Sequence, residues 1–282
     1  MVAAASHIPR REVAPVPDQR MKSRTARDTD VIRGKRVLVT RPRAQSSALV
    51  QRLRALGAEP VLFPTIRITS PSDGYTALDQ ALHEIASFDW IVFTSVNGVK
   101  HVWQRLTWLG IDPHLLQGVR LAAIGPATAK ALRARGMHVE VMPERYVAEA
   151  LLTVIPTPTT QRFLLPRADA ARGALRTGLQ AAGAVVVEVH AYCTVPVAPS
   201  RRALATLEAG IDVLTFTSSS TVQHFVQQLG HQRAHALAAG GRVVVIGPIT
   251  ADTAREFGLR VDVVATEYTI PGLIEAVIEV CV

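Results

Sequence analysis

The chain has 282 residues, 48% of them hydrophobic, and its formal net charge at pH 7 is +8. It is long enough to bury two modest cores, and no apolar run reaches the roughly 18 residues of a membrane span. Its two cysteines, Cys193 and Cys281, lie far apart and lack the spacing of a zinc site. We therefore expect a cytoplasmic protein with no membrane contact, no disulfide framework and no metal.

The positive charge is concentrated at the N-terminus. Residues 1–36 hold nine Lys/Arg against four Asp/Glu, whereas the remainder holds 22 against 19. Residues 1–32 have few large apolar side chains and several prolines, so we predict a disordered basic tail. An organellar transit peptide, which the acids disfavour, and a later start at Met21 are the alternatives. No aromatic residues alternate with the basic ones in a recognition module, so no nucleic-acid partner is expected.

After the tail, short apolar runs alternate with segments of helical spacing, which is the pattern of a mostly parallel α/β sheet. The runs predicted as buried strands are Val37–Thr40, Trp90–Phe93, Leu121–Ile124, Phe163–Leu165, Val213–Phe216 and Val243–Ile246. Predicted helices include Gln45–Leu56, Val96–Leu109 and Ala127–Arg135, and two further strands are predicted at Val139–Met142 and Val261–Ala265. Helix ends are predicted where glycine can adopt the left-handed conformation, at Gly57, Gly136, Gly183 and Gly258.

The chain also repeats itself. Phe93–Leu106 returns as Phe216–Leu229, and Ile124–Glu140 returns as Ile246–Asp262, at offsets of 123 and 122 residues. A weaker third pair, VLVTRPRA and FLLPRADA with their flanks, repeats at an offset of 126. Because this period is too long for a solenoid, we predict two similar α/β domains that face each other across a cleft.

Two extended segments, Pro60–Thr69 and Val185–Val197, are longer than ordinary sheet strands. We predict that each crosses from one domain to the other, although two sequential domains split near Pro156–Thr160 are the competing arrangement. The predicted limits are 33–66 plus 196–282 for a discontinuous first domain, 72–190 for an inserted second domain, and 67–71 and 191–195 for the linkers.

The usual cofactor and nucleophile motifs are missing. The chain has no GxGxxG after a strand, no P-loop, no GxSxG and no HExxH, which argues against a dinucleotide enzyme, an NTPase, an α/β-hydrolase and a zinc protease. Four predicted strands instead end in turns that are rich in hydroxyls and glycine and have no Asp or Glu. Such turns line the crevice of an open α/β sheet, where helix N–H groups bind anions.

These turns supply the candidate binding residues. They are Thr94, Ser95, Asn97, Gly125, Thr128, Thr217, Ser218, Ser219, Gly247 and Thr250. Arg41 and Arg167, at equivalent places after the first strand of each repeat, are predicted to add bidentate donors. Helix capping explains any single turn, but four turns in two repeats favour a ligand.

The second crossing segment holds a candidate proton donor. Strand alternation would place His190 and Tyr192 on one face and Cys193 on the other. If the segment borders the cleft, the Tyr192 phenol could protonate a leaving group. By contrast, His101 and His224, at equivalent positions of two predicted helices, are predicted to be packed or solvated.

From Arg36 to Ile278 the chain resembles the uroporphyrinogen-III synthase family. The resemblance rests on VLVTRP, DWIVFTSVNGV, AAIGPATAKAL, LLPRADAARGAL, VEVHAYCTVP, DVLTFTSSSTVQHF, VVIGPITADTA and VDVVATEYTIPGLIEAV, in this order. It implies two flavodoxin-like three-layer domains with mostly parallel sheets, a two-stranded linker, an active cleft between the domains and no metal or organic cofactor. The chain departs from the family's pattern at His190 and in its N-terminal tail.

The resemblance also implies an activity. The substrate would be hydroxymethylbilane, a linear tetrapyrrole rich in carboxylates, and a cyclising lyase would close it through a spiro intermediate with ring D inverted. Tyr192 matches the family's tyrosine and the hydroxyl turns match its binding turns. We expect a monomer, and transient contacts with neighbouring enzymes of the pathway are an open alternative. A two-domain binder of an anionic small molecule is the alternative, and a glycosyltransferase is disfavoured because no acidic cluster stands at the strand ends.

Overall fold

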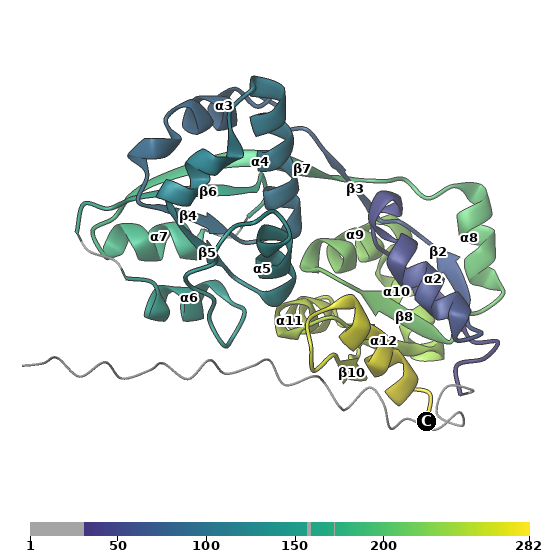
Figure 1. The fold of residues 1–282 in the computed structure, drawn as a ribbon. Coiled ribbons are helices and arrows are strands. Elements are labelled where there is room, and N and C mark those ends of the chain that lie inside the picture. Colours follow the sequence, from purple (N-terminus) through teal and green to yellow (C-terminus); the bar gives the residue numbers. More distant parts are fainter. Residues whose placement is uncertain (1–30, 157–158, 172) are drawn as a thin grey trace, which may run out of the picture.

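The computed structural model describes residues 31–156, 159–171 and 173–282, which form two α/β domains joined by extended strands (Figure 1). The predicted tail therefore lies outside the described residues except at its end. Val31 and Ile32 were assigned to it, but Ile32 is fully buried in the first domain. Two apolar residues next to the first strand are enough to join its core.

The sheet of the first domain has five parallel strands in the order β10-β9-β8-β1-β2. Counted along the chain within this domain, the order is 2-1-3-4-5, the flavodoxin order. The strands are β1 Arg36–Val39, β2 Glu59–Leu62, β8 Val213–Phe216, β9 Arg242–Val245 and β10 Val263–Val264. Residues from both ends of the described chain thus share one sheet.

The sheet of the second domain has the order β3-β7-β6-β4-β5. All its strands are parallel except β3, which pairs antiparallel with the end of β7. The strands are β3 Ile66–Thr69, β4 Trp90–Phe93, β5 Arg120–Ala123, β6 Arg162–Ala168 and β7 Val185–Pro196. Without β3 the four remaining strands have the order 2-1-3-4 along the chain, the first four positions of the flavodoxin order.

Strand β7 belongs to both the sheet and the connection between the domains. Its first part pairs with β6, and its last residues, Cys193–Pro196, pair with β3 in a two-stranded ladder. Figure 1 shows β3 and β7 running side by side from one domain towards the other. The exact domain limits stay a prediction.

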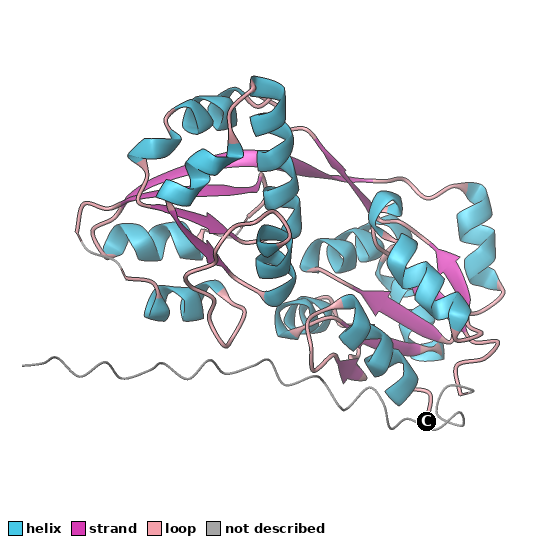
Figure 2. Ribbon diagram, in the orientation of Figure 1, coloured by secondary structure: helices cyan, strands magenta, loops and turns pink. Residues whose placement is uncertain are grey.

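Each sheet is covered by helices on both faces, which gives three layers (Figure 2). In the first domain, α2 and α12 cover one face and α8, α9, α10 and α11 the other. These helices are α2 Ser47–Ala55, α8 Arg201–Glu208, α9 Ser219–Leu229, α10 His231–Gly240, α11 Pro248–Glu256 and α12 Ile270–Glu279.

In the second domain, α3, α4 and α5 cover one face and α6 and α7 the other. They are α3 Thr76–His83, α4 Val96–Leu109, α5 Pro126–Arg133, α6 Ala148–Val154 and α7 Ala174–Ala181, with 3-10 turns η2 Arg43–Gln45, η3 Ile85–Ser87 and η4 Pro113–Gly118. No helix in the described part of the chain is long and apolar enough to cross a membrane.

Most predicted elements are present within one or two residues. The four predicted helix-ending glycines all have positive φ, between 75° and 87°. The predicted strand Val139–Met142 is wrong, because only a single bridge joins Val141 to Ala122. Pro143 follows at once and has no N–H to donate, so pairing at this sheet edge stops there.

Candidate active site

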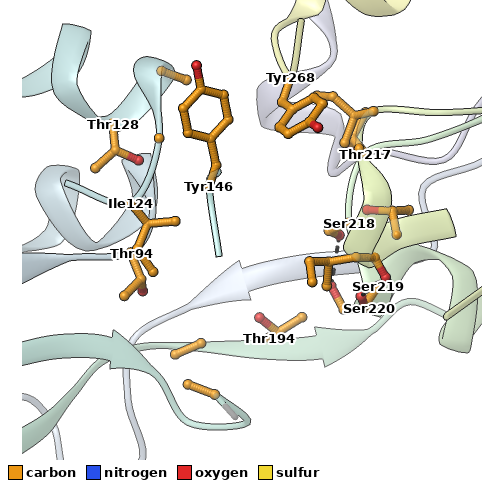
Figure 3. Close-up of a pocket in the computed structure, with 18 of the residues that line it drawn as sticks. Thr94, Ile124, Thr128, Tyr146, Thr194, Thr217, Ser218, Ser219, Ser220 and Tyr268 are labelled. Carbon is orange, nitrogen blue, oxygen red and sulfur yellow. Dashed lines mark hydrogen bonds between the residues drawn. The ribbon is translucent and has the colours of Figure 1, made fainter. Parts of the chain in front are cut away.

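A cavity of about 590 Å³ lies between the two domains. Its walls are strand-to-helix turns from both: Figure 3 shows Thr94, Ile124 and Thr128 on one side, and Thr217 with Ser218 to Ser220 on the other. Thr194 of β7 lies between the two walls. No Asp, Glu, Lys or Arg is among the described residues that line the cavity.

The structure brings most of the predicted binding residues to this cavity. The ones that line it are Thr94, Gly125, Thr128, Tyr192, Thr217, Ser218, Ser219, Gly247 and Thr250. They come together because the carboxyl ends of parallel strands meet at one sheet edge, and the edges of the two domains face each other.

Capping accounts for two of these turns, the one before α4, which Ser95 caps, and the one before α9. Ser218 forms a capping box with Thr221, in which its hydroxyl accepts from the Thr221 backbone N–H and the Thr221 hydroxyl accepts from the Ser218 N–H. In the turns before α5 and α11 the N-cap residues are glycines, Gly125 and Gly247, and no side chain makes a cap bond. A ligand is therefore free to take the N–H groups of these two helices.

Thr128 and Thr250 occupy equivalent places in those two turns. Each is the third residue of its helix, after a proline in the first position, and each is largely buried at the cavity wall, 5% and 4% exposed. Neither hydroxyl has a hydrogen-bond partner in the described parts of the chain. Because neither caps its helix, both hydroxyls are available to a ligand.

Tyr192 reaches the cavity through an irregularity in β7. The pairing with β6 shifts between Arg167 and Ala168, so that Arg167 opposes His190 and Ala168 opposes Tyr192. The extra residue, Ala191, forms a β-bulge. The predicted alternation is consequently wrong here: His190 is exposed, while Ala191 and Tyr192 are both buried in the same core.

The phenol of Tyr192 is hydrogen-bonded and 7% of the residue is exposed. Its oxygen lies 3.0 Å from the Ser95 hydroxyl, and Asn97 also hydrogen-bonds to it. Burial raises the pKa of Tyr192 above its usual value, and the bonds to Ser95 and Asn97 oppose that shift. The phenol is thus protonated at neutral pH and can serve as a proton donor.

A stack of rings supports Tyr192 from behind. The His101 ring lies 5.6 Å from the Tyr192 ring in a stacked arrangement, and His101 Nδ1 is 2.8 Å from the hydroxyl of Tyr75. Arg105 covers Tyr75 and forms two hydrogen bonds with Asp79. Burial lowers the pKa of His101, so this packed imidazole is neutral.

Ser95 and Asn97 do not line the cavity but contact Tyr192. The Ser95 hydroxyl also caps α4 by accepting from the Gly98 N–H, which fixes it in place. The Asn97 amide oxygen accepts a 2.8 Å bond from Gln45 of the first domain. The hydrogen bonds around Tyr192 therefore extend across the domain boundary.

Comparison with known proteins assigns the chain to a family. The family model described as uroporphyrinogen-III synthase HemD matches residues 47–275. A uroporphyrinogen-III synthase of Synechococcus elongatus is 36% identical over 257 residues, which cover 86% of this chain and 94% of the relative. The chain belongs to the uroporphyrinogen-III synthase family. A synthase of Chlorobaculum parvum is 30% identical, covering 87% of this chain and 98% of its own length.

Solved structures of uroporphyrinogen-III synthases share the fold. A mutant enzyme from Thermus thermophilus superposes with a TM-score of 0.66 at 21% identity, covering 88% of this chain and 98% of the other. The Helicobacter pylori enzyme superposes with a TM-score of 0.56 at 17% identity, covering 87% and 99%. The two-domain α/β architecture is thus that of the family.

The two arginines predicted as donors after the first strands do not line the cavity, and Arg167 lies within β6 and not after it. Arg167 is 6% exposed and forms a 2.9 Å ion pair with Glu188. Arg41 is half-buried, burial lowers its pKa, and its Nε has no partner in the described residues. In this conformation the described walls of the cavity offer hydroxyls and backbone N–H groups as donors, and no arginine.

Several residues at the cavity were not predicted. They are Tyr146, Thr194, Ser220, Gln223, His224 and Tyr268. His224 was predicted to be packed or solvated but lines the cavity, whereas its equivalent His101 is buried behind Tyr192. The two tyrosines could have been found by extending the repeat, because Tyr146 and Tyr268 are 122 residues apart.

Proposed function

We propose that this protein is a uroporphyrinogen-III synthase, a cyclising hydro-lyase that converts hydroxymethylbilane into uroporphyrinogen III. The observation that carries the proposal is the Tyr192 phenol at a cavity between two domains, with no carboxylate among the described residues that line it. Such a cavity complements an anionic substrate that needs an acid. The family membership supplies the reaction.

The cavity walls support binding of the substrate carboxylates. The first N–H groups of α5 and α11 have no acceptor within their own helices, and the Thr128 and Thr250 hydroxyls lie next to them. Helix N-termini favour anions because their N–H groups and the helix dipole point at the ligand. We propose that the two turns bind carboxylates at opposite ends of the tetrapyrrole.

We propose that Tyr192 starts the reaction. Its phenol donates a proton to the hydroxyl of the ring A hydroxymethyl group, and water leaves as the pyrrole lone pair forms the azafulvene. Ring D then attacks through its substituted carbon, which gives the spiro intermediate. That intermediate fragments and closes again with ring D inverted. The proton that is lost when the last pyrrole is restored returns to the phenolate. Tyr192 is therefore protonated again at the end of the reaction.

The remaining task of the cavity is geometric. The bilane closes by itself to the isomer without inversion, so the enzyme must hold the reacting carbons in the arrangement that leads to the spiro intermediate. Holding reactants in a near-attack geometry can lower a barrier by roughly 7–11 kcal/mol. We propose that the hydroxyl turns of both domains do this together.

We further propose that the protein acts as a monomer in the cytoplasm without a cofactor. The two cysteines are free, as a reducing compartment requires. Size-exclusion chromatography with light scattering would check the monomer, and fractionation of cells would check the location.

The test is a product assay. The purified protein is incubated with hydroxymethylbilane under anaerobic conditions, and the products are oxidised and separated as uroporphyrin isomers. We expect type III with the protein, and type I in a sample without protein and in one with heated protein. Type I alone in all three samples would overturn the proposal.

A further inference from the structure

Tyr146 and Tyr268 lie at equivalent positions of the two repeats, 122 residues apart. Tyr146 is in the loop between α5 and α6, and Tyr268 is in the loop between β10 and α12. Figure 3 shows both side chains on the side of the cavity that lies away from Thr194, one from each domain.

The two tyrosines touch across the domain boundary. Their ring centroids are 5.2 Å apart and the rings are nearly perpendicular, at 87°. Such an edge-to-face pair is worth about 0.5–1.5 kcal/mol beyond the area that it buries. It is a weak contact, which a ligand that enters between the domains can replace.

Each ring packs on the glycine turn of its own domain. A Cβ added to Gly125 would lie 3.6 Å from Tyr146, and one added to Gly247 would lie 3.3 Å from the ring of Tyr268. These glycines are also the N-caps of α5 and α11. Each tyrosine therefore stands beside a helix N-terminus that the proposed function assigns to a substrate carboxylate.

The phenol oxygens of the two tyrosines have no hydrogen-bond partner in the described parts of the chain. No described lysine or arginine lines the cavity, so a polycarboxylate there depends on neutral donors. A phenol O–H is such a donor, and the attached ring offers an apolar face to a pyrrole.

We propose that Tyr146 and Tyr268 are a substrate-binding pair, which separates to admit the tetrapyrrole and then holds pyrrole rings between its two rings. The hydroxyls donate to carboxylates of those pyrroles. This inference rests on the proposed function and extends it, because nothing else assigns a role to either residue.

The test compares ring loss with hydroxyl loss. Tyr146→Ala and Tyr268→Ala should each raise KM about tenfold, the equivalent of about 1.4 kcal/mol, while kcat stays within a few-fold. Tyr146→Phe and Tyr268→Phe keep the ring and should raise KM by a smaller factor. Leu115→Ala, which removes an exposed apolar side chain outside the cavity, is the control and should leave KM unchanged.

If the two tyrosine rings form only a structural contact or a gate, the kinetic result is different. Without its partner ring the cavity would open more easily, so kcat/KM of the alanine variants would stay equal or rise. That outcome, with type III still formed by the parent, overturns the proposal that the tyrosine pair binds substrate. The proposed function is not affected by it.

A binding measurement separates the two proposals. Uroporphyrin III, the stable oxidised product, is titrated into parent and variants, and its fluorescence is followed. If the parent makes no type III, the proposed function falls. The pair is then judged by binding alone, where about tenfold weaker binding by both alanine variants supports it and equal binding overturns it.

Discussion

A tyrosine with a raised pKa is a weak acid, so its use as a proton donor needs a reason. Burial keeps the Tyr192 phenol protonated, and the bonds from Ser95 and Asn97 fix its position. The leaving hydroxyl is pushed out by an electron-rich pyrrole, so the reaction asks for correct placement of a proton more than for a strong acid. The neutral, stacked His101 serves placement as well.

Tyr192→Phe tests that role directly. Removing the phenol should lower kcat by roughly 10² to 10⁴, the range for loss of a general acid, with KM nearly unchanged. Because unprocessed bilane closes by itself, the products should shift from type III towards type I. Steady-state kinetics with isomer analysis would measure both.

The pH profile gives the control for Tyr192. A raised pKa keeps the phenol protonated to higher pH, so the parent rate should fall only above the ordinary tyrosine value of about 10. Tyr192→Phe should lack this alkaline decline. A variant that makes type III at the parental rate would exclude Tyr192 from the mechanism.

Thr128→Ala and Thr250→Ala test the two equivalent turns. Since neither hydroxyl caps its helix, the free energy of unfolding should change little. Each variant should lose one hydrogen bond to a carboxylate, about 1.5–3 kcal/mol or roughly ten- to a hundredfold in kcat/KM.

Thr107→Ala is the matched control for these threonines, because Thr107 lies on α4 away from the cavity and its hydroxyl donates to the carbonyl of Trp103. Thermal unfolding and kinetics should be measured together. Full activity in both cavity variants would show that the two threonine hydroxyls do not bind the substrate.

The two arginines show that the direction of a single side chain is hard to predict from the sequence. Their equivalent places in the repeat predict the same setting for both, but Arg41 follows β1 whereas Arg167 lies within β6, and the direction of a side chain depends on its neighbours in space. Arg167 pairs with Glu188, which β7 places beside β6. That neighbour comes from strand register, which no local pattern gave.

Among the elements, those fixed by local chemistry were predictable. Buried apolar runs became β4, β6 and β8, and glycines with positive φ ended helices. The bulge at Ala191 was not predictable, because it depends on how β6 and β7 pair. This one extra residue turns Tyr192 towards the cavity, so the most important side chain is placed by the least predictable feature.

The repeat predicted more of the site than any single element did. Two copies of a strand, a hydroxyl turn and a helix imply two facing turns, and the cavity is built from them. The tyrosine pair was not predicted because Tyr146 and Tyr268 lie in loops, where the periodicity of helices and strands gives no signal. Only the common offset marks them.

At the scale of the whole molecule, the domains are joined by a narrow connection. Besides the β3/β7 ladder, the described contacts that bridge them include the Gln45–Asn97 hydrogen bond and the Tyr146–Tyr268 ring pair. Each of these two contacts is weak by itself, and relative domain motion is the default when an interface is small.

We therefore expect the free protein to sample several interdomain angles. Small-angle scattering of the free chain should need more than one angle to fit, and saturation with uroporphyrin III should narrow the distribution, because the ligand contacts both domains at once. Gln45→Ala removes one bridging bond and should widen the distribution of the free protein, whereas Gln104→Ala, an exposed glutamine on α4 with no described bond across the boundary, should not. A single angle that fits the free, bound and Gln45→Ala samples alike would show a rigid pair of domains, and substrate would then have to enter without any separation of the tyrosines.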